Sequence, residues 1–139
     1  MSNDWFQDVT DFCTKVRHDK VPNFPAVAHP FHQQLARKLI KEEIKELLHA
    51  ITMNNLAAIA DGGVDSIVVI LGAMIYYGID IRPIWDIIHK TNMAKAGGRF
   101  NPDGKLLKPE GWVGPDIAGE IRRQIANLNT TVAPSDKGN

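Results

Sequence analysis

Apolar residues recur at the spacing of an α-helix along most of the chain, and proline, glycine and asparagine interrupt the pattern. The first apolar face lies between residues 3 and 18. The periodicity then predicts helices at about residues 30–53, 54–78 and 80–96, and a last helix that begins near Pro115. We therefore expect an all-α protein, an antiparallel bundle of four to five helices.

The predicted helix at residues 54–78 is apolar around nearly its whole circumference, and its second half reads IVVILGAMIYY. A helix of this kind must be buried on all sides. We therefore expect a second copy of the chain to complete the bundle, most simply in a homodimer, with a homotetramer as the alternative. A strand over residues 66–71 is the competing interpretation, because Ile and Val favour strands. The alanine-rich start and the aspartate spacing favour the helix.

A chain of 139 residues with 44% apolar residues predicts a single domain over residues 1–139, with a flexible tail at about residues 128–139. The longest uncharged apolar run, residues 67–79, is shorter than the roughly 18 residues that a membrane span needs. The N-terminus lacks the pattern of a signal peptide, and the single cysteine suits a reducing compartment. We expect a cytoplasmic protein that does not contact a membrane. Lys plus Arg and Asp plus Glu balance at 16 each, so no net field attracts a nucleic acid polymer.

Acidic residues interrupt the apolar faces of two neighbouring predicted helices. On a helical wheel Glu42, Glu43 and Glu46 project among apolar residues, opposite the lysines of the same segment. On the next helix Asp61 and Asp65 are four residues apart and share a face with apolar neighbours. We therefore expect these carboxylates to point into the interior. Two carboxylates about 5 Å apart repel by about 3 kcal/mol at an effective dielectric constant near 20, unless a proton or a cation neutralises them.

A divalent cation with oxygen ligands would remove this repulsion. Facing carboxylates from the two helices predict a Mg²⁺ site, with Mn²⁺ as the alternative ion. The predicted metal ligands are Glu43, Glu46, Asp61 and Asp65. No histidine or cysteine stands at ligand spacing with these acids, which disfavours zinc or a di-iron centre. The competing interpretation is a solvated acidic helix face, since an EExxE string is common on surface helices.

A second group of polar residues lies at the end of the fourth predicted helix and in the loop that follows it. Asn92 and Lys95 present an amide and an ammonium group from one face, which suits phosphate oxygens. The alternative is an ordinary helix end with a lysine near its C-terminus. Residues 97–114 predict a long loop that docks on the protein, and Lys108 could add a cationic donor from it. Trp112 either stacks on a base or fills the core.

Four segments, LIKEEIKELL, ADGGVDSIVVILGAMIYYGID, IIHKTNMAKA and GKLLKPEGWVGPDI, follow one another in this order. Together they resemble the all-α nucleoside triphosphate pyrophosphatases, most closely the MazG-like and phosphoribosyl-ATP pyrophosphohydrolase-like proteins. The resemblance covers about residues 35–117. It implies magnesium-dependent hydrolysis of a nucleoside triphosphate, with deoxy and non-standard nucleotides among the candidates, to a monophosphate and pyrophosphate.

The resemblance extends to single residues. The family pattern is EExxE on one helix and ExxD on the next, and the residues that it implies to be catalytic are Glu42, Glu43, Glu46 and Asp65. Gly62 stands where the pattern has its second-helix glutamate, and Asp61 is the candidate substitute. The family's NxxK motif and the loop after it imply that the substrate-binding residues are Asn92, Lys95, Lys108 and Trp112.

Two other functions fit the same residues. A module of the same fold could bind nucleotide or metal with weak or no turnover, because Gly62 removes one ligand of the family pattern. A helical interaction protein could use the acids as a patch that faces a partner. Release of pyrophosphate would indicate the enzyme, and nucleotide binding without turnover would indicate the binding module. A melting temperature unaffected by magnesium would indicate the interaction protein.

Overall fold

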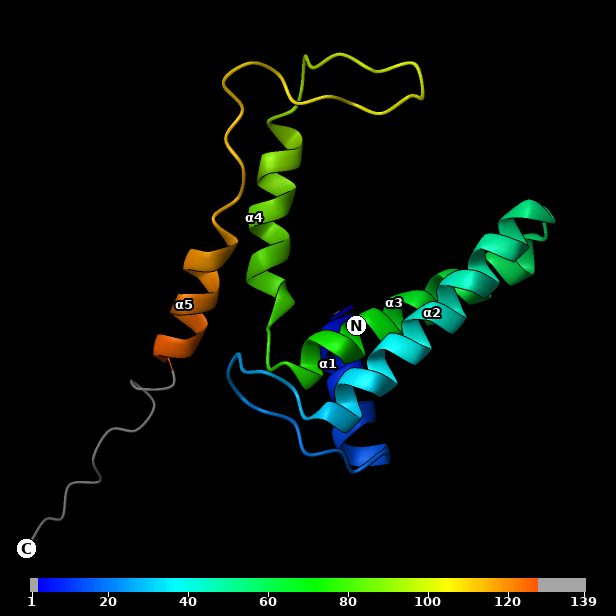
Figure 1. The fold of residues 1–139 in the computed structure, drawn as a ribbon, viewed down its shortest axis with the longest axis vertical. Helices are drawn as coiled ribbons and strands as arrows, with labels where there is room; N and C mark the ends of the chain where they lie inside the picture. The colour runs from blue at the N-terminus through cyan, green and yellow to red at the C-terminus, as the bar shows by residue number, and fades with distance from the viewer. Residues whose placement is uncertain (1–2, 128–139) are drawn as a thin grey trace, which may run out of the picture. The chain divides into compact units, whose positions relative to one another are not determined.

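The computed structural model describes residues 3–127, and the chain divides into two compact units, Met1–Asp80 and Ile81–Asn139 (Figure 1). The residues that it describes form helices and contain no β-strand beyond one isolated bridge, which confirms the all-α prediction. The predicted tail at residues 128–139 lies outside the described residues. The single domain and the dimer stay predictions.

The first unit consists of a short N-terminal helix and a long helical hairpin. Its elements are α1 (Trp5–Asp11), continued by a π-helix, η1 (Phe12–Val16), then α2 (Pro30–Thr52) and α3 (Leu56–Tyr76). Polar residues define the helix starts: His29 Nδ1 accepts the Phe31 N–H at 3.1 Å, and Asn55 Oδ1 accepts the Ala58 N–H at 3.2 Å. Between α2 and α3, Asn54 adopts a positive φ of 51°, which turns the chain back on itself.

Small residues allow α2 and α3 to pack closely along their length. Ala36 and Ala50 of α2 and Gly62 and Ser66 of α3 are buried. A Cβ atom added to Gly62 would lie only 3.2 Å from the Leu47 Cα atom, so a side chain at this position would press on the backbone of α2. The Ser66 hydroxyl donates to the Gly62 carbonyl at 2.6 Å and needs no partner outside its helix.

The C-terminal end of α3 is fixed by the loop that precedes α2. The Ala26 N–H donates to the Tyr77 carbonyl at 2.9 Å, and the Ile79 N–H donates to the Met74 carbonyl at 3.0 Å. Gly78 has a φ of 66°, and a Cβ atom there would collide with the Phe24 carbonyl oxygen. Glycine therefore meets both demands of this helix end, the left-handed conformation and the close approach of a second backbone.

The single chain leaves part of α3 exposed. The exposed fraction is 81% for Leu56, 60% for Val64 and 41% each for Ile67 and Ile70. By length and composition α3 is also the one helix among the described residues that could cross a membrane, a property that core helices of soluble proteins share. The expectation of burial on all sides is therefore not met within one copy of the chain.

The second unit contains α4 (Ile81–Met93) and α5 (Ile117–Asn127), joined by an irregular segment. Within that segment Phe100 and Leu106 form an isolated antiparallel bridge. The Trp112 indole N–H donates to the Thr91 carbonyl of α4 at 2.8 Å. The sequence-based expectation that this long loop docks on the protein is thereby confirmed.

Candidate active site

The carboxylates of α2 and α3 flank the seam between the two helices and do not point into the interior. Glu42, Glu46, Asp61 and Asp65 are exposed, and Glu43 is half-buried. The expectation that they face a dry interior is therefore wrong for the single chain. The physical reason is that alanine, glycine and serine form the seam, so the closest approach of the helices excludes the longer acidic side chains.

Glu43 is the exception because of its place in the seam pattern of α2. Ala36, Glu43 and Ala50 are seven residues apart, so they occupy equivalent positions along a helix pair. The two alanines are each 5% exposed. Glu43 thus places its carboxylate at the edge of a seam that is otherwise lined by small apolar groups.

Partial burial and nearby negative charge raise the pKa of Glu43 above its usual range. Partial burial is the largest cause, followed in decreasing order by repulsion from the carboxylates of Glu46, Asp65, Glu42 and Asp61. All the acidic residues that the sequence indicated therefore act on one carboxyl group. We call these five residues, Glu42, Glu43, Glu46, Asp61 and Asp65, the acidic cluster.

The acidic cluster fits a hard divalent cation in ligand chemistry, since carboxylate oxygens are the ligands that Mg²⁺ prefers. Its side chains do not converge on one point, because among residues 3–127 no three acidic, histidine or cysteine side chains are close enough to share an ion. Binding would therefore require side-chain rotation. Exposed glutamates on a helix can make this movement without disturbing the core.

Asp61 contributes to the field at Glu43, although less than Asp65 does. The neighbouring Gly62 lies in the seam against Leu47, and a Cβ atom there would make a tight contact of 3.2 Å with the Leu47 Cα atom. Asp61 remains the nearest acidic alternative on α3.

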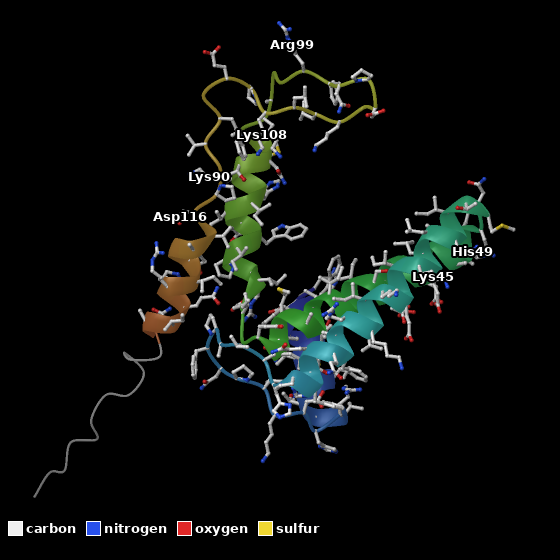
Figure 2. The ribbon with its side chains drawn as sticks, in the orientation of Figure 1. Lys45, His49, Lys90, Arg99, Lys108 and Asp116 are labelled. Carbon is white, nitrogen blue, oxygen red and sulfur yellow. The ribbon has the colours of Figure 1, made fainter. Side chains whose placement is uncertain are left out.

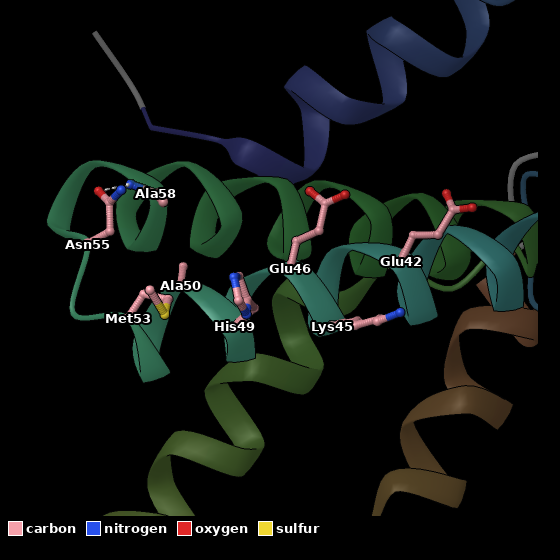
Figure 3. A pocket seen from close by; sticks show the side chains of 8 residues that line it. All are labelled: Glu42, Lys45, Glu46, His49, Ala50, Met53, Asn55 and Ala58. Atoms are coloured by element: carbon pink, nitrogen blue, oxygen red, sulfur yellow. Dashed lines mark hydrogen bonds between the residues drawn. The ribbon is translucent and has the colours of Figure 1, made fainter.

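A pocket of about 890 Å³ begins at the acidic cluster and continues toward the end of the hairpin (Figure 3). Its lining residues are Glu42, Lys45, Glu46, His49, Ala50, Met53, Asn55 and Ala58. His49 and Met53 were not expected in the site, because neither stands in a recognisable motif. His49 follows Glu46 by three residues, and Met53 follows His49 by four. This spacing could have placed both on the same helix face as Glu46.

Basic residues lie on α4 and in the loop after it, among them Lys90, Arg99 and Lys108 (Figure 2). The Lys95 ammonium donates to Asn92 Oδ1 at 2.9 Å and lies 5.4 Å from the centroid of the Trp112 ring. The Lys108 ammonium lies 4.7 Å from the same centroid. The structure therefore brings together all four residues that the sequence indicated for substrate binding, Asn92, Lys95, Lys108 and Trp112.

Sequence reasoning missed a polar cluster in the first unit. Asp19 accepts hydrogen bonds from Arg17 Nε at 2.8 Å and from the Tyr76 hydroxyl at 2.9 Å, and His32 Nε2 lies 3.6 Å away. The His32 and Tyr76 rings stack with their centroids 4.2 Å apart. Burial alone would raise the pKa of Asp19, but the hydrogen bonds from Arg17 and Tyr76 outweigh it and lower the pKa. No sequence signal links residues 57 positions apart, as Asp19 and Tyr76 are.

Comparison with known proteins identifies a family. The family model described as phosphoribosyl-ATP pyrophosphohydrolase matches residues 12–92, which include η1, the acidic cluster and Asn92. No curated protein matches the chain. The family match implies a pyrophosphohydrolase that acts on nucleotide-like substrates.

Proposed function

The chain belongs to the phosphoribosyl-ATP pyrophosphohydrolase family, and from that premise we propose that it hydrolyses a nucleoside triphosphate between the α and β phosphates. The products would be a nucleoside monophosphate and pyrophosphate, and the reaction would depend on magnesium. The observation that carries the proposal is the acidic cluster, in which partial burial, and after it repulsion from the other four carboxylates, raises the pKa of Glu43. Such mutual repulsion is relieved when a cation binds.

The acidic cluster supplies the proposed metal ligands. Glu43, Glu46 and Asp65 would hold Mg²⁺, and Asp61 would act as a fourth ligand. Bound Mg²⁺ would neutralise charge on the phosphates and lower the pKa of a water molecule. Glu42, which is exposed beside the pocket, would hold a second ion or accept the proton of the attacking water.

The second unit supplies the proposed phosphate donors. The Lys95 ammonium is oriented by Asn92, and the Lys108 ammonium lies in the same small region. Ammonium groups act as point charges toward phosphate oxygens. These residues would bind the charged end of the substrate.

The exposed apolar surface of α3 supports a proposed homodimer or homotetramer. Leu56, Val64, Ile67 and Ile70 would be covered by a second copy of the chain. Burial of apolar surface is favourable by about 25 cal/mol per Å². Analytical ultracentrifugation of the purified protein tests this assembly.

A second candidate is a nucleotide-binding protein of the same fold with little or no turnover. Gly62 favours it, because a glycine supplies no metal ligand at the position where the family pattern has a glutamate. This candidate predicts binding of a triphosphate with no release of pyrophosphate.

The decisive experiment incubates the purified protein with a panel of nucleoside triphosphates and MgCl₂. The expected product is pyrophosphate together with a monophosphate. Omitting magnesium, or adding excess chelator, should stop the reaction. Release of orthophosphate would show that a different bond is cut, and calorimetric binding without products would support the second candidate.

A further inference from the structure

We propose that Trp112 is a positioning residue, which holds Lys95 and Lys108 over its indole ring as one binding site for the phosphate chain of the substrate. The inference rests on the proposed function and deepens it, because it assigns a part of the substrate to this loop. It also gives Trp112 a role other than stacking on the base. The carrying observation is that both ammonium groups lie within 5.4 Å of one ring centroid.

The indole is held in place from two directions. Its N–H donates to the Thr91 carbonyl at 2.8 Å, which ties the ring to α4. The backbone N–H of Trp112 donates to the Pro109 carbonyl at 3.1 Å. Gly111, which lies between these two residues in the chain, adopts a φ of 77°, a conformation that favours glycine. The ring is therefore fixed by the fold, and the two flexible lysine side chains are placed by the ring.

The two ammonium groups over this ring favour the binding of an anion. Among residues 3–127 neither Lys95 nor Lys108 forms an ion pair with a carboxylate, although the two ammonium groups repel each other. The electron-rich face of tryptophan, the best aromatic partner for a cation, partly offsets that repulsion. The two ammonium groups carry six N–H donors in total, and within the described part of the chain one of the six is engaged, from Lys95 to Asn92. The remaining donors suit the many oxygens of a polyphosphate.

The test measures binding of inorganic tripolyphosphate to the full-length protein by calorimetry, in a buffer containing a chelator. Without divalent metal, the acidic cluster should repel this probe, so the measurement reports on the cationic loop. Trp112→Leu should weaken binding about tenfold, because it removes both cation–π contacts. Trp112→Phe keeps an aromatic face and should lose no more than about threefold. Trp85→Leu is the matched control, since Trp85 is an exposed tryptophan of α4, and should bind as the wild type does.

A double-mutant comparison distinguishes positioning from a merely structural role. In a Lys95→Ala, Lys108→Ala background, Trp112→Leu should have no further effect on tripolyphosphate binding. The proposal would be overturned if Trp112→Leu weakened tripolyphosphate binding just as much in that background. It would also be overturned if Trp112→Leu alone bound tripolyphosphate as the wild type does, or if Trp85→Leu weakened binding equally. The readout does not need turnover, so an inactive protein that still shows this pattern would refute the proposed reaction and leave the phosphate site standing.

Discussion

Asp19 and Glu43 lie in the same compact unit, and their surroundings shift their pKa values in opposite directions. Asp19 is surrounded by donors from Arg17 and Tyr76, which lower its pKa despite burial. Glu43 is half-buried, and this burial, together with repulsion from neighbouring carboxylates, raises its pKa. The first carboxylate is neutralised by the fold itself, so it contributes to stability. The second is left with repulsive neighbours, as expected for a group that binds an external cation.

Glu46→Ala is expected to have the largest effect and tests the functional side of this comparison. Removing a metal ligand should lower the rate of pyrophosphate release about a hundredfold or more. Its side chain is exposed, so the melting temperature in the absence of metal should not fall. Steady-state kinetics and thermal unfolding check both expectations. A Glu46→Ala variant that turns over at the wild-type rate would remove the acidic cluster from the reaction.

Asp19→Ala tests the structural side. The change should lower the free energy of unfolding by about 2–3 kcal/mol, because it removes charge-assisted hydrogen bonds and leaves their donors without this acceptor. Urea denaturation followed by circular dichroism measures the loss. Asp11→Ala is the control, since its carboxylate pairs with Lys15 on the surface, and it should change stability little. Equal stabilities of the two variants would contradict the assigned role of Asp19.

Gly62 and Gly63 offer a matched pair that tests the seam between α2 and α3. A Cβ atom at Gly63 meets no other atom within 4 Å, so Gly63→Ala should stabilise the helix by about 1 kcal/mol. At Gly62 the added Cβ would press on the Leu47 backbone, so Gly62→Ala should instead lower stability by about 1 kcal/mol. Chemical denaturation of both variants gives the comparison. Similar gains at both positions would show that the seam is looser than the structure indicates.

The pH dependence of stability should show the opposite shifts directly in metal-free buffer. The pKa of Asp19 is lowered in the folded state. Its contribution to the free energy of unfolding is therefore present above its unfolded pKa of about 3.9 and is lost as the pH falls through the folded pKa. The pKa of Glu43 is raised in the folded state. Its contribution to the free energy of unfolding is therefore present below its unfolded pKa of about 4.3 and is lost as the pH rises through the folded pKa. Asp19→Asn should flatten the acid limb, and Glu43→Gln should flatten the decline at higher pH. Identical pH profiles for the wild type and both variants would contradict the two pKa shifts.

The local pattern of the sequence predicted where most helices of this protein lie. Apolar spacing predicted α2 and α3 to within about two residues, and Pro30, Asn55 and Gly78 marked where they begin or end. The reason is that helical periodicity and helix ends depend on residues close together in the chain. The EExxE and NxxK segments could be recognised for the same reason, because their members share one helix or one helix end.

Tertiary structure decided which side chains the helices bury and which groups meet across the chain. A helical wheel placed the acids with the apolar residues, whereas the seam formed along Ala36, Ala50 and Gly62 and left most of the acids exposed. The contact of Tyr76 with Asp19 and that of Trp112 with Thr91 join residues distant in sequence. Such contacts depend on how closely whole helices and loops can approach each other, which is settled by the size and shape of many side chains at once.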